Sequence, residues 1–166
     1  MILWTVLAWV VLARLAELAL ARRNERRLRA RGAVEFGAGH YPLFFLLHGA
    51  WLLAVALLAD RNAPPVWGWL AVYGALQAAR VWTLASLGAY WTTRVLTLPA
   101  EPLVRRGPYR WLRHPNYLVV AAEIAALPLA FRLWTVALVF SVLNAMLLAW
   151  RLRIEEEALA PRRRTG

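Results

Sequence analysis

The stretch from residue 91 to residue 117 combines cationic and aromatic side chains with four prolines, among them Pro108 and Pro115. Proline fixes its own φ and restricts the residue before it, so this backbone is stiff. Arginine, histidine, tyrosine and tryptophan on a stiff backbone suit an anionic or zwitterionic ligand. The alternative interpretation is a belt of basic and aromatic side chains at the level of the lipid headgroups. Composition alone fits both.

A second polar group comes after the last apolar run, where Arg151 is followed by three consecutive acids, Glu155, Glu156 and Glu157. These acids run against the basic bias of the sequence around them. On a continuous helix Arg151 and Glu155 are four residues apart and can lie on one face. The simpler interpretation is a solvated helix end.

Polar residues also interrupt the apolar runs, namely Arg80, Glu123 and Asn144. Polar groups inside a membrane are functional candidates by default. A structural ion pair between Arg80 and Glu123 explains two of them equally well. His48 lies near the start of another apolar run, where a histidine is more often structural than a base.

The composition predicts membrane helices that carry these residues. Of the 166 residues, 61% are hydrophobic, and the mean hydropathy is +0.49. A soluble domain is nearer half apolar, and a disordered chain has far less apolar surface, so both classes are excluded. The apolar runs predict about five transmembrane helices in one domain covering residues 1–166: 2–21, 41–59, 66–87, 116–131 and 133–150. The expected fold class is therefore all-α, a polytopic membrane protein that ends in a helical hairpin, because only Arg132 separates the last two runs.

The distribution of charge predicts how the chain is oriented. All twenty basic residues are arginine, and they outnumber the acids to give a net charge of +11. Six lie in 22–31, five in 94–113 and five in 151–164, whereas the opposite turns hold only Arg61 and Arg132. The positive-inside rule then places the N-terminus outside and the three arginine blocks in the cytoplasm. Such blocks between apolar runs fit anionic lipid headgroups better than nucleic acid.

The counts of cysteine and histidine limit which catalytic groups and metal sites are possible. Absence of cysteine removes disulfides and thiolate catalysis, and three histidines without a carboxylate cluster predict no metal site. The arginine- and alanine-rich usage points to a bacterial source, and hence to the inner (cytoplasmic) membrane.

The polar motifs together resemble the isoprenylcysteine carboxyl methyltransferase family, which is related to the phospholipid methyltransferases. Three motifs carry the resemblance: Gly107-Pro108-Tyr109, then Arg113-His114-Pro115-Asn116-Tyr117, then Arg151 with Glu155-Glu156 and Leu159. The first 90 residues match only in kind, as membrane helices. This short form is similar to small bacterial members that are often associated with polyketide-derived lipids such as alkylpyrones.

The resemblance implies S-adenosylmethionine as cofactor and O-methylation of a lipidic or prenyl-like acceptor at the cytoplasmic face. It places the cofactor site mainly in 91–117 and 151–159, with these family positions in this chain: Leu103, Val104, Tyr109, His114, Pro115, Asn116, Tyr117 and Glu155. Arg113 or His114 is expected to pair with the cofactor carboxylate. Arg151 is expected to contact the acceptor. Family members usually have glycine where this chain has Val119, which is expected to narrow the pocket.

The acceptor itself stays open at this stage. A carboxylate needs no base, whereas an enol or phenol does, and His48 and Glu123 are the candidates. Phospholipid amine N-methylation is the nearest alternative, although an amine favours an acidic partner over Arg151. A non-catalytic membrane scaffold is the alternative of another class.

Overall fold

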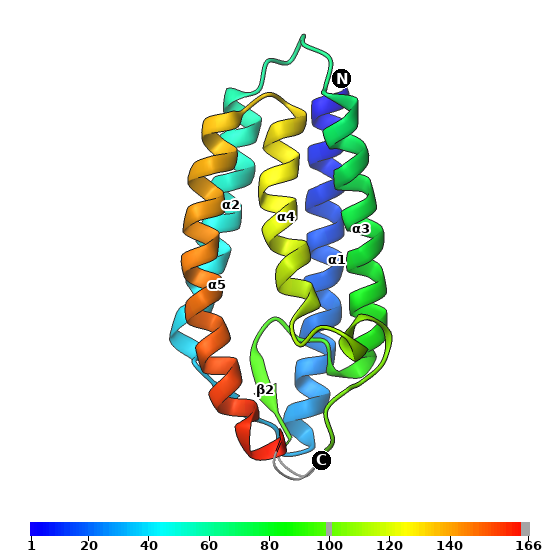
Figure 1. The fold of residues 1–166 in the computed structure, drawn as a ribbon, viewed down its shortest axis with the longest axis vertical. Coiled ribbons are helices and arrows are strands. Elements are labelled where there is room, and N and C mark those ends of the chain that lie inside the picture. The colour runs from blue at the N-terminus through cyan, green and yellow to red at the C-terminus, as the bar shows by residue number, and fades with distance from the viewer. Residues whose placement is uncertain (99–100, 164–166) are drawn as a thin grey trace.

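In the computed structural model, which describes residues 1–98 and 101–163, five α-helices lie side by side along one axis (Figure 1). For His40 and residues 160–163 the structure describes the backbone only. The helices are α1 (Ile2–Ala30), α2 (Tyr41–Leu58), α3 (Trp67–Leu87), α4 (Pro115–Ala130) and α5 (Trp134–Arg163). The chain is 76% helical, which confirms the all-α prediction.

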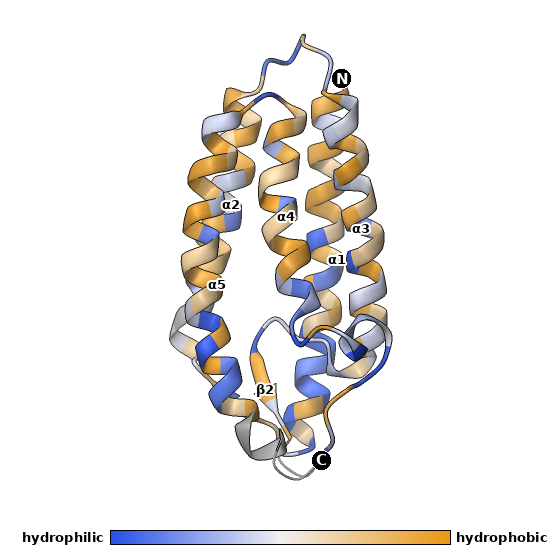
Figure 2. Ribbon diagram, in the orientation of Figure 1, coloured by the Kyte–Doolittle hydropathy of each residue, from blue (hydrophilic) through white to orange (hydrophobic). Residues whose placement is uncertain are grey.

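The outer surface of the bundle is apolar. Leu12, Leu46, Leu57 and Leu138 are each more than 60% exposed, an arrangement that suits lipid rather than water. Figure 2 shows hydrophobic residues along most of the bundle and hydrophilic ones gathered toward one end. Three described helices are long and apolar enough to cross a membrane, Ile2–Ala30, Tyr41–Leu58 and Trp134–Leu159, and Pro115–Ala130 is a shorter apolar helix. The prediction of five spans therefore remains a prediction.

The turns at the end of the bundle opposite the arginine blocks are tight. Asn62 N–H bonds Asp60 Oδ1 at 2.9 Å after α2, and Val66 N–H bonds Ala130 O at 2.8 Å. Arg132 has φ +61° between α4 and α5, and Leu133 N–H closes the turn on Pro128 O at 2.9 Å. The predicted C-terminal hairpin is thus confirmed. Beneath it, side chains such as Val10, Val55, Ile124 and Leu127 fill the core.

Two long helices depart from the predicted lengths. Helix α1 runs to Ala30, past the predicted end at residue 21, and α5 runs on past residue 150 to Arg163. Arginine is a good helix former and its long side chain keeps its charge in water, so the arginine blocks continue both helices beyond the apolar part.

The long connection after α3 has structure that the sequence did not predict. Strand β2 (Val95–Thr97) pairs antiparallel with β1 (Val34–Phe36), with Glu35 opposite Leu96. Short 3₁₀ helices η1 (Ala38–His40), η2 (Gly88–Tyr90) and η3 (Gly107–Arg110) complete the polar end of the bundle. The sheet ties the α1–α2 connection to the connection that carries most of the candidate site residues.

Candidate active site

A polar cavity of about 470 Å³ lies at the end of the bundle that holds the arginine blocks. Its volume is within the range of roughly 300–1,000 Å³ typical of small-molecule sites. Nearly all the residues predicted for the cofactor line it: Leu103, Val104, Tyr109, Arg113, His114, Asn116, Tyr117 and Glu155, together with Arg151. Pro115 is the exception among the predicted residues. It is the first residue of α4, where its missing N–H costs no helical hydrogen bond.

The hydroxyl of Tyr117 joins the two charged residues of α5. It donates a hydrogen bond to Glu155 Oε2 and accepts one from Arg151 Nε at 2.8 Å. The ring of His114 stacks on that of Tyr117 with centroids 5.3 Å apart, and His114 Nδ1 lies 3.6 Å from Glu155 Oε1. Arg151 and Glu155 thus lie on one face of α5, as their spacing predicts, and both contact Tyr117. Arg113, by contrast, is largely exposed at the rim.

The Gly-Pro-Tyr motif is packed directly against α3. Gly107 has φ +55°, and a Cβ there would overlap Ser86 Oγ and lie 2.9 Å from Ser86 Cβ. Arg106 Nε donates to Ser86 O at 2.6 Å beside it. Only glycine fits this conformation and this approach. The contact holds η3, and with it Tyr109, against the end of α3. Burial and the nearby Glu155 raise the pKa of Tyr109, so its phenol keeps its proton.

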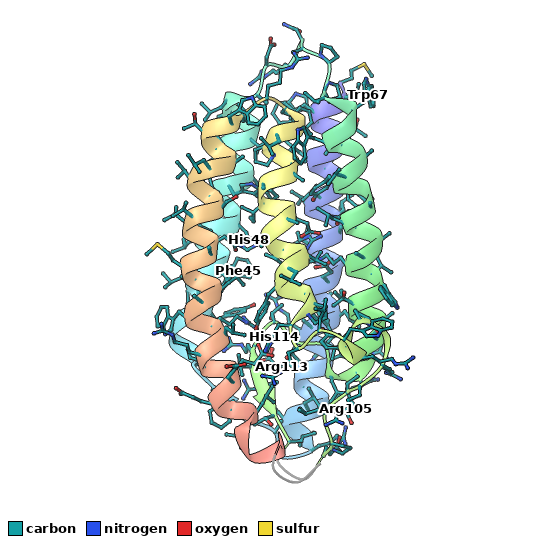
Figure 3. All side chains as sticks on the ribbon, viewed as in Figure 1. Phe45, His48, Trp67, Arg105, Arg113 and His114 are labelled. Atoms are coloured by element: carbon teal, nitrogen blue, oxygen red, sulfur yellow. The ribbon has the colours of Figure 1, made fainter. Side chains whose placement is uncertain are left out.

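A second, mainly apolar cavity of about 330 Å³ lies deeper in the bundle and is lined by residues of α1, α2, α3, α4 and α5. The three predicted catalytic residues, His48, Glu123 and Arg151, all line it. Figure 3 shows His48 and Phe45, which also lines it, at mid-height, and His114 and Arg113 nearer the polar end. Five residues line both cavities and form their junction: Trp91, Thr92, Asn116, Tyr117 and Arg151. Val119 lines neither of the two cavities, so the expectation that it narrows the pocket is wrong.

Glu123 belongs to a buried cluster of charges. Its Oε2 accepts from Arg80 Nη1 at 2.9 Å and its Oε1 from Gln77 Nε2 at 2.6 Å, so the structural interpretation of the Arg80 pair holds. Arg80 also makes a bidentate contact with Glu17, at 2.8 and 2.7 Å, and Arg14 Nη1 lies 3.1 Å from Glu17. Two cations and two carboxylates thus neutralise one another inside the bundle, as buried charges require.

His48 has one ring nitrogen committed. Its Nδ1 lies 2.8 Å from Phe44 O, and because a carbonyl only accepts, Nδ1 carries the proton. In the neutral ring, Nε2 is then the nitrogen that can accept a proton.

Sequence reasoning missed several residues that build the polar cavity. Leu28 and Ala33 line it from α1 and the α1–α2 connection. Asn24 is 3% exposed and donates to the carbonyls of Gly88 and Trp91. In the sequence, Asn24 is distinctive only as a single asparagine within an arginine-rich stretch. Such a residue cannot be told from a solvated one until the position of α3 is known.

A network of ion pairs lies next to the sheet. Glu35 Oε1 accepts from Arg94 Nη1 at 2.6 Å, and Glu35 Oε2 contacts Arg29. Arg94 Nε is also 3.0 Å from Glu25 Oε1. Partial burial alone would raise the pKa of Glu35, but the hydrogen bonds from Arg29 and Arg94 hold it below its ordinary value.

The polar and aromatic groups that line the polar cavity fit S-adenosylmethionine. Two buried atoms of its lining, His114 Nε2 and Asn116 Oδ1, have no hydrogen-bond partner within the described residues. Together with the Glu155 carboxylate they match the amine and hydroxyls of that cofactor, and the tyrosine rings match its adenine and sulfonium. The described residues contain no group of three metal-binding side chains.

The apolar helices define an integral membrane protein, with two neighbouring cavities that share part of their lining. Residues 69–161 match the profile of the Isoprenylcysteine carboxyl methyltransferase (ICMT) family, and this chain belongs to that family. The family is one of membrane methyltransferases.

Curated relatives resemble the chain over nearly its whole length. It is 42% identical over 160 residues to the uncharacterized protein YpbQ of Bacillus subtilis, covering 94% of this chain and 95% of the relative. It is 27% identical over 159 residues to an uncharacterized protein of Haemophilus influenzae, covering 92% of each. No solved structure matches it significantly.

Proposed function

We propose that this protein transfers a methyl group from S-adenosylmethionine to an oxygen of a lipidic acceptor at the cytoplasmic face of the membrane. The observation that carries the proposal is the junction of the two cavities. One cavity is polar and holds the family's cofactor positions, the other is mainly apolar, and five residues belong to both. Methyl transfer needs two ligands in contact and little acid–base machinery, so alignment supplies most of the acceleration.

Residues of the polar cavity are assigned to the cofactor. Glu155 accepts hydrogen bonds from its amine or ribose hydroxyls, and Asn116 and His114 satisfy further polar atoms. Arg113 at the rim pairs with its carboxylate. When bound, the cofactor supplies a methyl group on a sulfonium for in-line displacement by the acceptor oxygen. The arginine blocks support a cytoplasmic site, since this cofactor is cytosolic.

Residues of the apolar cavity are assigned to the acceptor. Its tail lies among side chains such as Phe45 and Leu52, and Arg151 orients the acceptor oxygen. Arg151 Nε is bonded to Tyr117, which leaves its two terminal nitrogens to face the ligand. A carboxylate acceptor then reacts as it is. A hydroxyl acceptor passes its proton to His48 Nε2, because both oxygens of Glu123 already accept hydrogen bonds.

The first test is calorimetric titration of the detergent-purified protein with S-adenosylhomocysteine, beside the Glu155→Ala and Glu157→Ala variants. We expect binding by the native protein, loss of at least tenfold in affinity for Glu155→Ala because a charged hydrogen bond is removed, and little change for the exposed Glu157. A folded native protein that binds none would refute the proposal and leave a membrane scaffold as the better interpretation.

The acceptor class is tested with three probes that share one tail: dodecanoic acid, 4-dodecylphenol and dodecylamine. Transfer of radiolabelled methyl groups to the acid or the phenol supports O-methylation, and Arg151→Ala is expected to abolish it while largely sparing S-adenosylhomocysteine binding. Transfer to the amine alone, undiminished in Arg151→Ala, would favour N-methylation instead.

A further inference from the structure

Trp91 lies at the junction of the two cavities. Its side chain is 6% exposed and lines both cavities. Its Nε1, which can only donate, has no hydrogen-bond partner among the described residues. The buried Trp51 differs in this respect, because its Nε1 donates to Ile124 O at 3.1 Å. Among the described residues, one buried indole N–H thus has a protein acceptor and the other has none.

The backbone holds Trp91 firmly in this place. Asn24 Nδ2 donates to Gly88 O at 3.0 Å and to Trp91 O at 2.9 Å, so it spans both ends of η2. Trp91 N–H bonds Gly88 O at 3.1 Å. The next residue, Thr92, donates to Arg94 O at 2.7 Å. A donor held in this way is preorganised for a ligand, because little freedom is lost when the ligand arrives.

We propose that the indole N–H of Trp91 donates a hydrogen bond to a ligand oxygen at the junction, and that Asn24 is the positioning residue that holds it there. The inference rests on the proposed function, which places two ligands side by side at this point. The oxygen belongs either to the methyl acceptor or to the carboxylate of the cofactor. Both offer a lone pair to the same N–H.

The role of Asn24 would give α1, which already lines both cavities, a positioning function in the site. Residue 24 lies outside the region that matches the family profile, which begins at residue 69. Its amide nitrogen carries two protons, and both are used on carbonyl oxygens. Aspartate at this position could only accept, so it would oppose both carbonyls.

The indole proton can be observed directly by NMR. The chain has ten tryptophans, and the cross-peak missing from Trp91→Phe identifies Trp91. Trp67, which lies at the other end of the bundle, is assigned in the same way and serves as the control (Figure 3). We expect the Trp91 proton to move downfield on ligand addition and the Trp67 proton to stay in place.

The order of addition distinguishes the two oxygens. A shift with S-adenosylhomocysteine alone assigns the bond to the cofactor carboxylate. A shift that appears only after a probe acceptor is added assigns it to the acceptor oxygen. Absence of both shifts in a sample that binds S-adenosylhomocysteine calorimetrically overturns the inference but spares the proposed function. Absence of calorimetric binding refutes both.

Kinetics supply a second readout. If the acceptor oxygen is the partner, Trp91→Phe should raise the KM of the methylated probe roughly tenfold, as expected for one lost hydrogen bond, and leave S-adenosylhomocysteine affinity within about twofold. Asn24→Leu should change KM in the same direction, and the double variant should lose little more, because Asn24 acts through Trp91. Fully additive losses would contradict a positioning role. Should Asn24→Leu fail to fold, the spectra and kinetics of Trp91→Phe still decide.

Discussion

Among individual side chains, Tyr117 makes the contacts that connect the two cavities. Its hydroxyl bonds Glu155 and Arg151, and its ring stacks on His114. The residues assigned to the cofactor and the residue assigned to the acceptor therefore share one partner. A change in the position of Tyr117 would disturb both at once, which makes it a poor residue with which to separate their roles. Glu155 and Arg151, one helical turn apart, separate them better.

Gly107 offers a test of how the site is held against α3. Gly107→Ala should lower stability by roughly 1–3 kcal/mol from the left-handed backbone alone, and the overlap with Ser86 adds to this. Weaker S-adenosylhomocysteine binding is expected as well, because Tyr109 is displaced with η3. Thermal unfolding in detergent and calorimetry measure the two effects.

Gly74 is the matched control within α3, because a Cβ there meets nothing within 4 Å. Gly74→Ala should stabilise the helix by roughly 0.5–1 kcal/mol. If the two variants had the same melting temperature and the same affinity for S-adenosylhomocysteine, the close packing of Gly107 would not matter for the site.

At the level of secondary structure, the sheet of β1 and β2 links two connections that are far apart in sequence. Val34 pairs with Thr97, and the ion pairs of Glu35 with Arg29 and Arg94 reinforce the link. Thr97 lines the polar cavity, so a contact made by the α1–α2 connection reaches the cofactor site. A sheet of two short strands is only marginally stable by itself, and here the ion pairs of Glu35 stabilise it.

The charge of Glu35 makes this link sensitive to pH. Since the folded state holds the pKa of Glu35 below its ordinary value of 4.5, its contribution is present above that value and is lost as the pH falls through the lower, folded pKa. Native protein should therefore melt at a higher temperature than Glu35→Gln at pH 7, and the difference should close at acid pH. Glu157→Gln, on the exposed face of α5, should show no such difference at pH 7. A gap that stayed constant down to pH 3 would contradict this account.

Considered as a whole, the molecule has an apolar outside and a charged interior cluster, the reverse of a water-soluble protein. Arg14, Glu17, Arg80 and Glu123 meet from three helices, and each pair is hydrogen-bonded or in close ionic contact. Loss of one partner would leave an uncompensated charge in the bundle. The cluster therefore holds α1, α3 and α4 together beside the apolar cavity, which all four residues line.

The orientation of the whole chain can be tested with single cysteines, because the native sequence has none. Asn62→Cys in the α2–α3 turn should react with a membrane-impermeant maleimide in intact cells. Arg27→Cys, near the end of α1, should react only after permeabilisation, because the arginine blocks are expected to stay in the cytoplasm. The reverse pattern would put the polar cavity on the side that lacks the proposed cofactor.

Much of this protein could be predicted from its residues taken in order. Hydropathy marked the five helices to within a few residues at most ends, and the residues predicted for the cofactor, apart from Pro115, do line one cavity. These properties are local, because apolar runs and short motifs are read without knowing which helices are neighbours. The resemblance of the motifs likewise agreed with the family match.

Only the tertiary structure determines which partner each polar atom has. Whether Glu123 is a base or a structural ion depends on Arg80 and Gln77, more than forty residues away, and both oxygens prove to be taken. The bonds of Asn24 to η2 and the residues shared by the two cavities depend on how the helices pack. The same holds for Trp91 Nε1, which has no partner among the described residues. Hydrogen bonds form between atoms brought within about 3 Å, and sequence distance does not report that separation.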